Sequence, residues 1–301
     1  MQNLAHLYAK LTHRYQLANK QGMVSTEIAG LRYFHSPHYS APTAMVYEPG
    51  IVIIGTGKKT AYLDNKEIQY NAEQHLLLTV PSPLECETIA SQDEPLQGLF
   101  IELDLPKLHR IAHEILCSLP DIFDSKNDTL TGIVPVPVTE ELVHIQRRLL
   151  NVMQSPLDAR ILGEGIIDEF IYRILLLPQG QPLFALIDLT THYGNIAKTI
   201  NQAQDNLSKN YTVEGLAAFS GMSVSAFHRA FKQVTQQSPL QYIKKMRLFK
   251  AKTLIVHEKV SVSIAAQKVG YESVSQFSRE FKRLFKVPPS QSEKIGYPEL
   301  V

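Results

Sequence analysis

Several features that define large classes of protein are scarce in this sequence, and each shortage excludes a class. Only two of the 301 residues are cysteine, Cys86 and Cys117. Two cysteines give no disulfide framework of the kind that staples small secreted domains, so a reduced, cytoplasmic setting is expected. No uncharged apolar run approaches the ~20 residues that a membrane-spanning helix needs, and no charged-then-apolar leader opens the chain. We therefore predict a soluble cytoplasmic protein with no membrane partner.

Histidines are present, but they are not spaced as a metal site. A metal-binding cupin needs a His-x-His pair, a carboxylate and a later histidine. Here His35 and His38 are three residues apart. His75 stands alone before an apolar strand, and the pair His109 and His113 has no evident third ligand. Because no nucleophile–base motif is evident either, the sequence predicts no cofactor, no metal and no enzymatic activity.

The net charge is small in total but unevenly distributed. Residues 190–301 contain 16 Lys and Arg against 7 Asp and Glu, a net charge of +9, whereas residues 1–189 contain 14 against 22, a net charge of −8. The whole-chain value of +1 therefore hides a basic C-terminal third. Binding to the phosphates of a nucleic acid requires such a region, although a merely solvated basic face would look the same.

A nine-residue segment occurs twice in that basic third. Residues 224–232 and 274–282 are identical at six positions. In the first copy Gly221 suits the left-handed position that ends a helix, and Ser223 is a natural N-cap for a helix over residues 224–235. Phe residues one turn apart would face inward and polar or basic side chains outward, which predicts two helix-turn-helix units. The inward-facing aromatic residues are Phe227, Phe231, Phe277 and Phe281.

The segment between the two copies reads as one longer basic helix over residues 239–256. Eighteen residues at ~1.5 Å each make a rod of roughly 27 Å, which would hold two recognition helices about one DNA turn, ~34 Å, apart. The alternative is a helical repeat array in which the Phe residues are only core. Arrays usually need three or more copies, and this chain has two copies joined by a dissimilar helix.

These residues carry a family resemblance. The run Ser263–Ser273, followed by Phe277-Ser278-Arg279, Phe281-Lys282 and Pro288-Pro289, resembles the signature of AraC-type (AraC/XylS) transcription regulators. In that family two helix-turn-helix units enter adjacent major grooves of double-stranded DNA. The resemblance implies DNA contacts at Ser225, His228, Arg229 and Lys232 in the first helix, and at Ser275, Gln276, Ser278, Arg279 and Lys282 in the second.

The two copies differ at the predicted DNA-reading positions. The first helix has small Ser225 and Ala226 where bulkier side chains often sit, so its base reading would rest on His228 and Arg229. Each helix has one arginine, which would contact either a guanine edge or a phosphate. Lys232 and its counterpart lie toward the helix ends, where phosphate contacts or solubility charges are expected.

The N-terminal part has a different texture. After a predicted helix over residues 4–19, about eight short β-rich runs separated by turn residues predict a sandwich or small barrel. The expected strands are residues 31–34, 44–47, 51–55, 60–63, 67–70, 75–80, 84–90 and 97–103. Helices are expected over 105–117, 139–153 and 159–177, with a loop at 121–137.

Residues 24–105, above all the run Val46–Lys59, resemble the cupin-like N-terminal domain of a subset of AraC-type regulators. The predicted fold class is therefore α+β, with a cupin-like β-barrel flanked by helices and an all-α C-terminal domain. We expect a sensor and dimerisation domain at 1–187 and a DNA-binding domain at 188–301. At 44% hydrophobic residues the chain can bury two cores.

An effector pocket inside the barrel would be lined by alternate strand residues. Plain core packing is an equally good interpretation for every candidate. An electrophile-sensing role for one of them, the Cys86 thiol, also remains open. The candidates are Tyr47, Ile53, Leu78, Cys86 and Phe100.

The helix over 159–177 has an apolar stripe of Leu162, Ile166, Phe170 and Ile174. We expect the stripe to pair with its counterpart in a second chain, aided by residues 139–153; the alternative is that it packs on its own barrel. The resemblance as a whole implies a transcription regulator, an activator or a repressor, whose partners are DNA, RNA polymerase, a small organic effector and a second copy. From another class, a cupin-type enzyme or metabolite-binding protein with an accessory DNA-binding tail remains an alternative.

Overall fold

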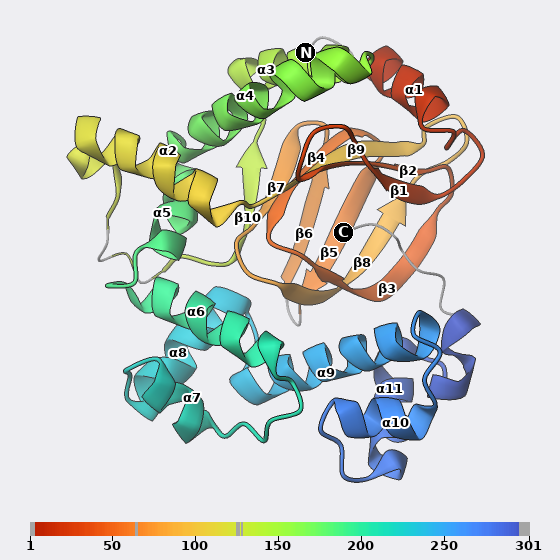
Figure 1. Cartoon of the computed structure of the whole chain (residues 1–301), viewed down its shortest axis with the longest axis vertical. Coiled ribbons are helices and arrows are strands. Elements are labelled where there is room, and N and C mark those ends of the chain that lie inside the picture. Colours follow the sequence, from red (N-terminus) through yellow and green to blue (C-terminus); the bar gives the residue numbers. More distant parts are fainter. Residues whose placement is uncertain (1–3, 64–65, 125–126, 128, 295–301) are drawn as a thin grey trace.

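A curled antiparallel sheet and a helical region make up the two halves of the chain (Figure 1). The computed structural model describes residues 4–63, 66–124, 127 and 129–294. The strands are β1 (Gly22–Ser25), β2 (Leu31–Ser36), β3 (Ser40–Tyr47), β4 (Gly50–Thr56), β5 (Lys58–Leu63), β6 (Lys66–Asn71), β7 (Gln74–Leu78), β8 (Ser82–Ile89), β9 (Leu96–Glu102) and β10 (Ile133–Pro137).

The strands pair in the order β1-β2-β9-β4-β7-β6-β5-β8-β3, and β10 pairs with β7. The sheet curls on itself, so the predicted barrel-like fold class is confirmed, as are the eight predicted strands, β2 to β9. β10 lies where a loop was predicted, because Pro135 and Pro137 argue against a strand. It pairs only with β7, which leaves one side of the strand free of ladder bonds that a proline could not make.

Alternate residues of each strand belong to different apolar clusters. Val52, Leu78 and Phe100 face the interior of the curl. Ile53 and Leu77 face the other side, where helices cover the sheet. The helices that cover the sheet are α1 (Ala5–Arg14), α3 (Glu140–Val152) and α4 (Pro156–Leu175), and α2 (Leu105–Ser118) and α5 (Gln181–Ile187) lie beside them (Figure 1). We call residues 4–187 the sheet region.

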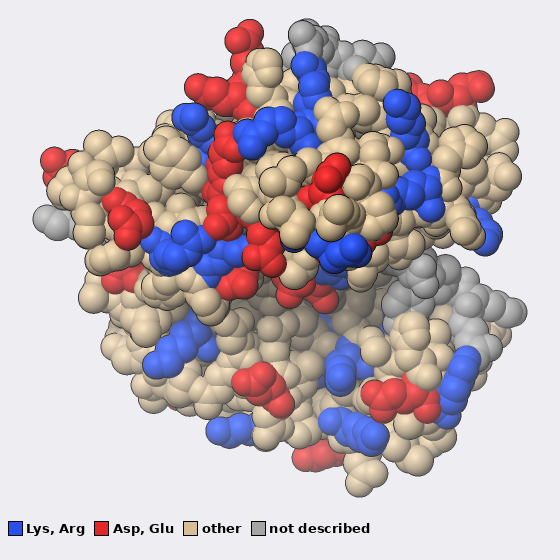
Figure 2. Space-filling view, turned by 45° about the horizontal axis from the view of Figure 1, so that its top comes forward, with Lys and Arg blue, Asp and Glu red and all other residues tan. Residues whose placement is uncertain are grey.

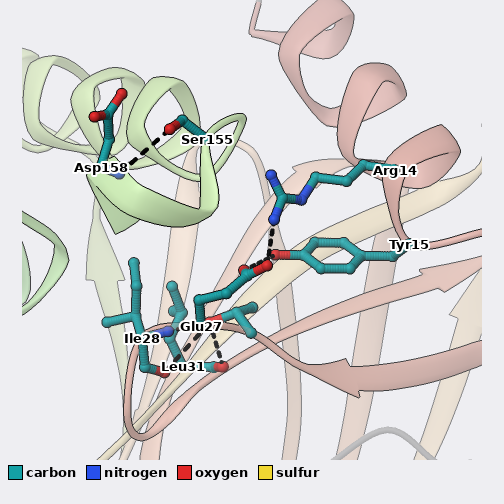
Figure 3. A network of polar contacts seen from close by, with 8 residues as sticks. Arg14, Tyr15, Glu27, Ile28, Leu31, Ser155 and Asp158 are labelled. Atoms are coloured by element: carbon teal, nitrogen blue, oxygen red, sulfur yellow. Dashed lines mark hydrogen bonds and ion pairs between the residues drawn. The ribbon is translucent and has the colours of Figure 1, made fainter. Parts of the chain in front are cut away.

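Polar contacts fix α1 to the sheet and to its neighbouring helices. Arg14 and the Tyr15 hydroxyl both bind the Glu27 carboxylate in the turn before β2, the latter at 3.2 Å (Figure 3). The Tyr8 hydroxyl accepts a 2.6 Å hydrogen bond from Gln146 of α3. Gly55 is required opposite Tyr8, because a Cβ there would lie 2.0 Å from the tyrosine ring.

The stripe on α4 packs on its own chain, so most of it is not a free surface. Ile166, Phe170 and Ile174 are buried against the sheet region, and only Leu162 of the four is exposed. The expectation that this stripe pairs with a second chain was therefore wrong for three of its residues, since periodicity identifies an apolar face but not what covers it. The large hydrophobic side chains that α4 does expose are Leu157, Ile161, Leu162 and, less fully, Tyr172.

The helical region contains α6 (His192–Asp205), α7 (Val213–Phe219), α8 (Val224–Thr235), α9 (Pro239–Val256), α10 (Val262–Lys268) and α11 (Val274–Phe285). The bounds predicted for the first repeated helix and for the long basic helix are confirmed by α8 and α9. We call α7–α8 the first unit and α10–α11 the second unit. In Figure 1 the first unit lies at the left end of α9 and the second unit lies below its right end.

The surface and the helix lengths give two further observations. On the face shown in Figure 2, acidic and basic side chains are mixed over the sheet region. Within the described part of the chain, no single helix has the length and apolar composition to cross a membrane. One pair bent by 104°, Pro156–Leu175 with Pro178–Ile187, meets those two criteria together.

Candidate nucleic-acid interface

The first recognition helix, α8, is set by its turn and by two buried rings. Gly221 has a φ of +69°, which is the left-handed conformation expected at the end of α7. Ser223 then caps α8 by accepting a 3.3 Å bond from the Ala226 N–H. Phe227 and Phe231 are buried, with ring centroids 5.5 Å apart. The face opposite these rings is consequently the one that faces solvent.

All four DNA-contact candidates on α8 are exposed: Ser225, His228, Arg229 and Lys232. The small residues of the first copy are partly covered, because Ala226 and Ala230 face the sheet region. They line a cavity of about 290 Å³ together with Arg229 and with the loop that follows α2. The first recognition helix therefore has one face open and its flank against the sheet region.

The second recognition helix, α11, repeats the local geometry more tightly. Gly270 has a φ of +83°, and a Cβ there would lie 2.6 Å from the Ser208 carbonyl oxygen. This glycine is needed both for its backbone conformation and for the close approach of the segment before α7. Ser273 caps α11 by accepting a 3.2 Å bond from the Gln276 N–H. Phe277 and Phe281 are fully buried.

Most candidates on α11 are exposed, namely Ser275, Gln276, Arg279 and Lys282, whereas Ser278 is half-buried. The Gln276 amide bonds Glu280 at 3.3 Å. Glu280 replaces Ala230 of the first copy, and its carboxylate also accepts bonds from Lys244 at 3.0 Å and Tyr271 at 2.7 Å. Sequence reasoning missed Glu280, although it is one of the three positions at which the repeated segments differ.

The two units are anchored differently. The apolar cluster that contains Phe227 and Phe231 continues through α6 and α9 into the sheet region, while Phe277 and Phe281 belong to a separate cluster that includes only Ala44 from the sheet. Side-chain hydrogen bonds follow the same division. Side chains of the first unit and of the segments next to it donate hydrogen bonds to backbone carbonyls of the sheet region. These bonds are Tyr242 to Pro81 at 2.7 Å, Gln237 to Pro83 at 2.9 Å, Gln233 to Thr129 at 2.7 Å and Tyr193 to Thr131 at 3.3 Å.

Four of the five effector-pocket candidates, Tyr47, Leu78, Cys86 and Phe100, lie together in the interior of the curl. Ile53 does not, because it is one residue out of phase with the inward-facing positions of β4 and packs under the helices. The interior also holds a polar group that sequence reasoning missed: Lys59, which is buried. Its inward orientation follows from alternation with Ala61 and Leu63 in β5, so the signal was present.

Lys59 and its neighbours form a buried polar cluster. Tyr47 and Tyr70 hydroxyls lie 2.5 Å apart, and each is 3.4 Å from Cys86 Sγ. The Lys59 Nζ lies 5.1 Å from the centre of the Tyr47 ring. Burial lowers the pKa of Lys59, although the nearby Cys86 opposes that shift. Burial also raises the pKa of both tyrosines, so their hydroxyls stay protonated donors.

The histidines considered as metal ligands are dispersed. His75 is buried beside the Phe170 ring with neither ring nitrogen hydrogen-bonded. His109 and His113 lie on the exposed side of α2, where His113 Nε2 is 3.6 Å from Cys117 Sγ. Among the described residues, no three or more His, Cys, Asp or Glu side chains are grouped so that they could hold a metal ion.

Two family descriptions match the chain. Residues 27–182 match the N-terminus of AraC-type transcriptional regulators, and residues 216–294 match a helix-turn-helix domain. An uncharacterised HTH-type transcriptional regulator of Haemophilus influenzae is 35% identical over 211 residues, which cover 66% of this chain and 68% of that protein. The lactose operon transcription activator of Staphylococcus xylosus is 22% identical over 51% of this chain and 55% of its own length. The match thus spans about half to two-thirds of these relatives.

Solved structures with the same fold include ToxT of Vibrio cholerae. The apo form of a ToxT point variant superposes with a TM-score of 0.59 at 14% identity, over 90% of this chain and 99% of ToxT. ToxT bound to an unsaturated fatty acid superposes with a TM-score of 0.55 at 12% identity, over 92% and 96%. At these identities the likeness shows a shared fold. It includes both the curled sheet and the paired helix-turn-helix units.

Proposed function

The chain belongs to the AraC-type transcriptional regulators, and from this premise we propose that it is a sequence-specific DNA-binding regulator whose helices α8 and α11 enter adjacent major grooves. One observation carries the proposal. Each recognition helix has a pair of buried Phe rings on one face and exposed polar and basic side chains on the other. The two helices are joined by α9, whose 18 residues give a rod of roughly 27 Å, close to one turn of DNA.

The exposed side chains divide into two roles. Arg279 and Arg229 would read guanine edges, with His228, Ser225, Ser275, Gln276 and Ser278 completing the two base-reading faces. Lys232 and Lys282, nearer the helix ends, would contact phosphates and contribute affinity without sequence preference.

A pool of random DNA duplexes incubated with the full chain tests this proposal. The selected sequences should contain two preferred segments about one helical turn apart. Arg279→Ala should cost ~1–3 kcal/mol on the selected site and relax preference at one base pair. Lys282→Ala should weaken binding to all duplexes alike and lower the slope of log affinity against log salt by about one. If the wild-type chain enriched no particular sequence from the pool, the proposal would be wrong.

The sheet region would act as the sensor, which divides the chain at 1–187 and 188–301. Structures of ToxT contain an unsaturated fatty acid or a naphthalenyl butenoic acid, both of which join an apolar body to a carboxylate. In this chain Lys59 provides a buried amine inside an apolar curl, and no described carboxylate pairs with it. We therefore expect an effector with an apolar body and an acidic group, and no metal.

The matched pair decanoate and decanol tests that effector class. Decanoate should raise the melting temperature of the full chain, and Lys59→Met should abolish the rise, since a ligand that binds only the folded state stabilises it. Equal shifts from the acid and the alcohol would show that the amine has no part in binding. Cys86→Ser should leave the response unchanged unless sensing is covalent.

A second copy of the chain would bind at the exposed end of α4. Leu157, Ile161 and Leu162 are 61%, 72% and 51% exposed, and a Cβ at neighbouring Gly165 would touch nothing. Such a patch supports a homodimer. From the family we further propose that this dimer activates transcription with RNA polymerase in the cytoplasm and has no enzymatic activity of its own. Ile161→Glu should then sediment as a monomer, and a wild-type monomer at micromolar concentration would exclude the dimer.

A further inference from the structure

The Glu280 carboxylate, in the middle of the second recognition helix, accepts hydrogen bonds from the side chains of Lys244, Tyr271 and Gln276. Lys244 of α9 reaches one of its oxygens at 3.0 Å, and Tyr271, in the turn before α11, reaches the other at 2.7 Å. The Glu280 side chain is only 14% exposed and that of Lys244 33%. The group therefore links the recognition helix, its turn and the α9 rod in one polar contact.

The surroundings of this contact are fixed as well. Arg247, one turn along α9 from Lys244, donates to the carbonyls of Leu207 and Lys209, each at 2.8 Å. The Tyr271 ring packs edge-on against Phe277, with centroids 5.3 Å apart. Both partners of Glu280 thus belong to elements that are themselves anchored, so the carboxylate has a defined position.

The protonation state of Glu280 decides what it can offer to a neighbour. Burial favours its neutral form, but hydrogen bonds from Tyr271, Lys244 and Gln276 outweigh that and lower the pKa below its ordinary value. At neutral pH the group is a carboxylate, which accepts hydrogen bonds and donates none. A carboxylate neighbour can therefore be approached by the N–H side of an amide and not by its C=O side.

Gln276 is the neighbour that this constraint acts on. Its amide nitrogen donates to Glu280 at 3.3 Å, so its carbonyl oxygen and its second N–H remain for other partners on the exposed face of α11. A glutamine with one acceptor and one donor available matches adenine, which presents N6–H₂ and N7 in the major groove. An amide free to turn over can also offer two N–H donors to the O6 and N7 acceptors of guanine.

We propose that Glu280 is a positioning residue that fixes the amide orientation of Gln276, and that the second unit thereby prefers adenine over guanine at one base pair. The first unit has no such device, because Ala226 and Ala230 occupy the equivalent positions. This inference rests on the proposed DNA-reading function and adds a specific base preference to it.

Selection from a random duplex pool by the full chain and its Glu280→Gln variant tests the inference. The variant keeps the shape of the side chain but can present either face of an amide, so it no longer dictates the orientation of Gln276. We expect adenine-over-guanine discrimination at one base pair of the second half-site to fall by about tenfold, with the first half-site unchanged. Glu272→Gln, the same charge change at an exposed position nearby, should leave every base preference intact.

Coupling to Gln276 separates positioning from a general structural role. If Glu280 acts through Gln276, the double variant Gln276→Ala/Glu280→Gln should show the same preference at that base pair as Gln276→Ala alone. A uniform loss over both half-sites, or an unchanged preference in Glu280→Gln, would overturn the inference. No preference in the wild type would instead refute the proposed function itself.

A second variant covers loss of folding. If Glu280→Gln melts below the assay temperature, Lys244→Met can take its place. This variant removes one hydrogen-bond donor to Glu280 and leaves the negative charge of the Glu280 carboxylate in place. It should relax the same base pair in the same direction by a smaller factor. An unchanged preference in that variant would also count against the positioning role.

Discussion

The two helix-turn-helix units share a sequence pattern but are held in place by different means. The first unit is an extension of the sheet region, because its Phe rings lie in the same apolar cluster and its flanks bond to the carbonyls of Pro81, Pro83 and Thr129. The second unit has its own apolar cluster and a polar contact centred on Glu280. An event in the sheet region is therefore expected to reach the first unit through the core that they share, and the second unit mainly through α9, since the second cluster includes only Ala44 from the sheet.

Equivalent core truncations should give the largest contrast between the units. Phe231→Ala and Phe281→Ala each remove a buried ring, so each should cost about 3–5 kcal/mol in the unfolding of the part that contains it. Hydrogen exchange followed by mass spectrometry locates the loss. Phe231→Ala should raise exchange in α6–α8 and in the sheet region, and Phe281→Ala only in α10–α11. If both variants raised exchange over the whole chain, the two units would not differ in how they are attached.

A fall in pH should destabilise the sheet region and the first unit more than the second unit, by a smaller free energy than the core truncations. Burial without a hydrogen-bond partner lowers the pKa of His75 to about 3 from an ordinary 6.5. Because the folded pKa lies below the unfolded one, the stability that the neutral ring allows is fully present above pH 6.5 and is lost as the pH falls toward 3. The expected loss at pH 5 is about 2 kcal/mol.

Urea unfolding at pH 7 and pH 5 measures this loss. His75→Leu should remove most of the difference between the two pH values. Exchange in the first unit should rise with that in the sheet region at pH 5, while exchange in the second unit should not. Equal acid sensitivity of wild type and His75→Leu would assign the loss to other groups.

Removal of a single tyrosine hydroxyl should give the smallest loss of stability and still distinguish the attachment of the first unit from that of the second. Tyr242→Phe deletes the bond to the buried Pro81 carbonyl, at a cost of ~1–2 kcal/mol to the attachment of the first unit. Tyr271→Phe deletes the hydroxyl bond to Glu280 and should leave the sheet region unaffected. Melting curves of the full chain with and without each change compare the two. A sheet region destabilised by Tyr271→Phe would show that the second unit is attached as firmly as the first.

Periodicity and turn chemistry predicted most of the fold. The bounds of α8 and α9 and the eight strands β2 to β9 follow from apolar spacing, glycine turns and N-caps, which are local signals. The elements that sequence missed depend on distant partners. α5, for instance, is a short apolar segment that becomes a helix where it packs beside α2 and α6, and β10 pairs with a strand more than fifty residues earlier.

In the candidate site too, features set by local sequence were predictable and features set by distant partners were not. Exposure of Arg279 and Lys282 follows from the position of the Phe rings on the same helix. The role of Glu280 does not, because its partner Lys244 comes from another helix and no local spacing relates them. Ile53 was assigned to the interior of the sheet because alternation gives two sets of residues without stating which set faces inward.

The shared core of the first unit and the sheet region has a practical consequence for recombining regulators. A hybrid joined near residue 188 would place a foreign partner opposite Phe227, Phe231 and Tyr193, and it would have to match an apolar surface shaped for this chain. A junction within the C-terminal half of α9 would exchange only the second unit, whose core is self-contained apart from Ala44. The part of this protein that can be exchanged without redesign is thus smaller than a whole DNA-binding region.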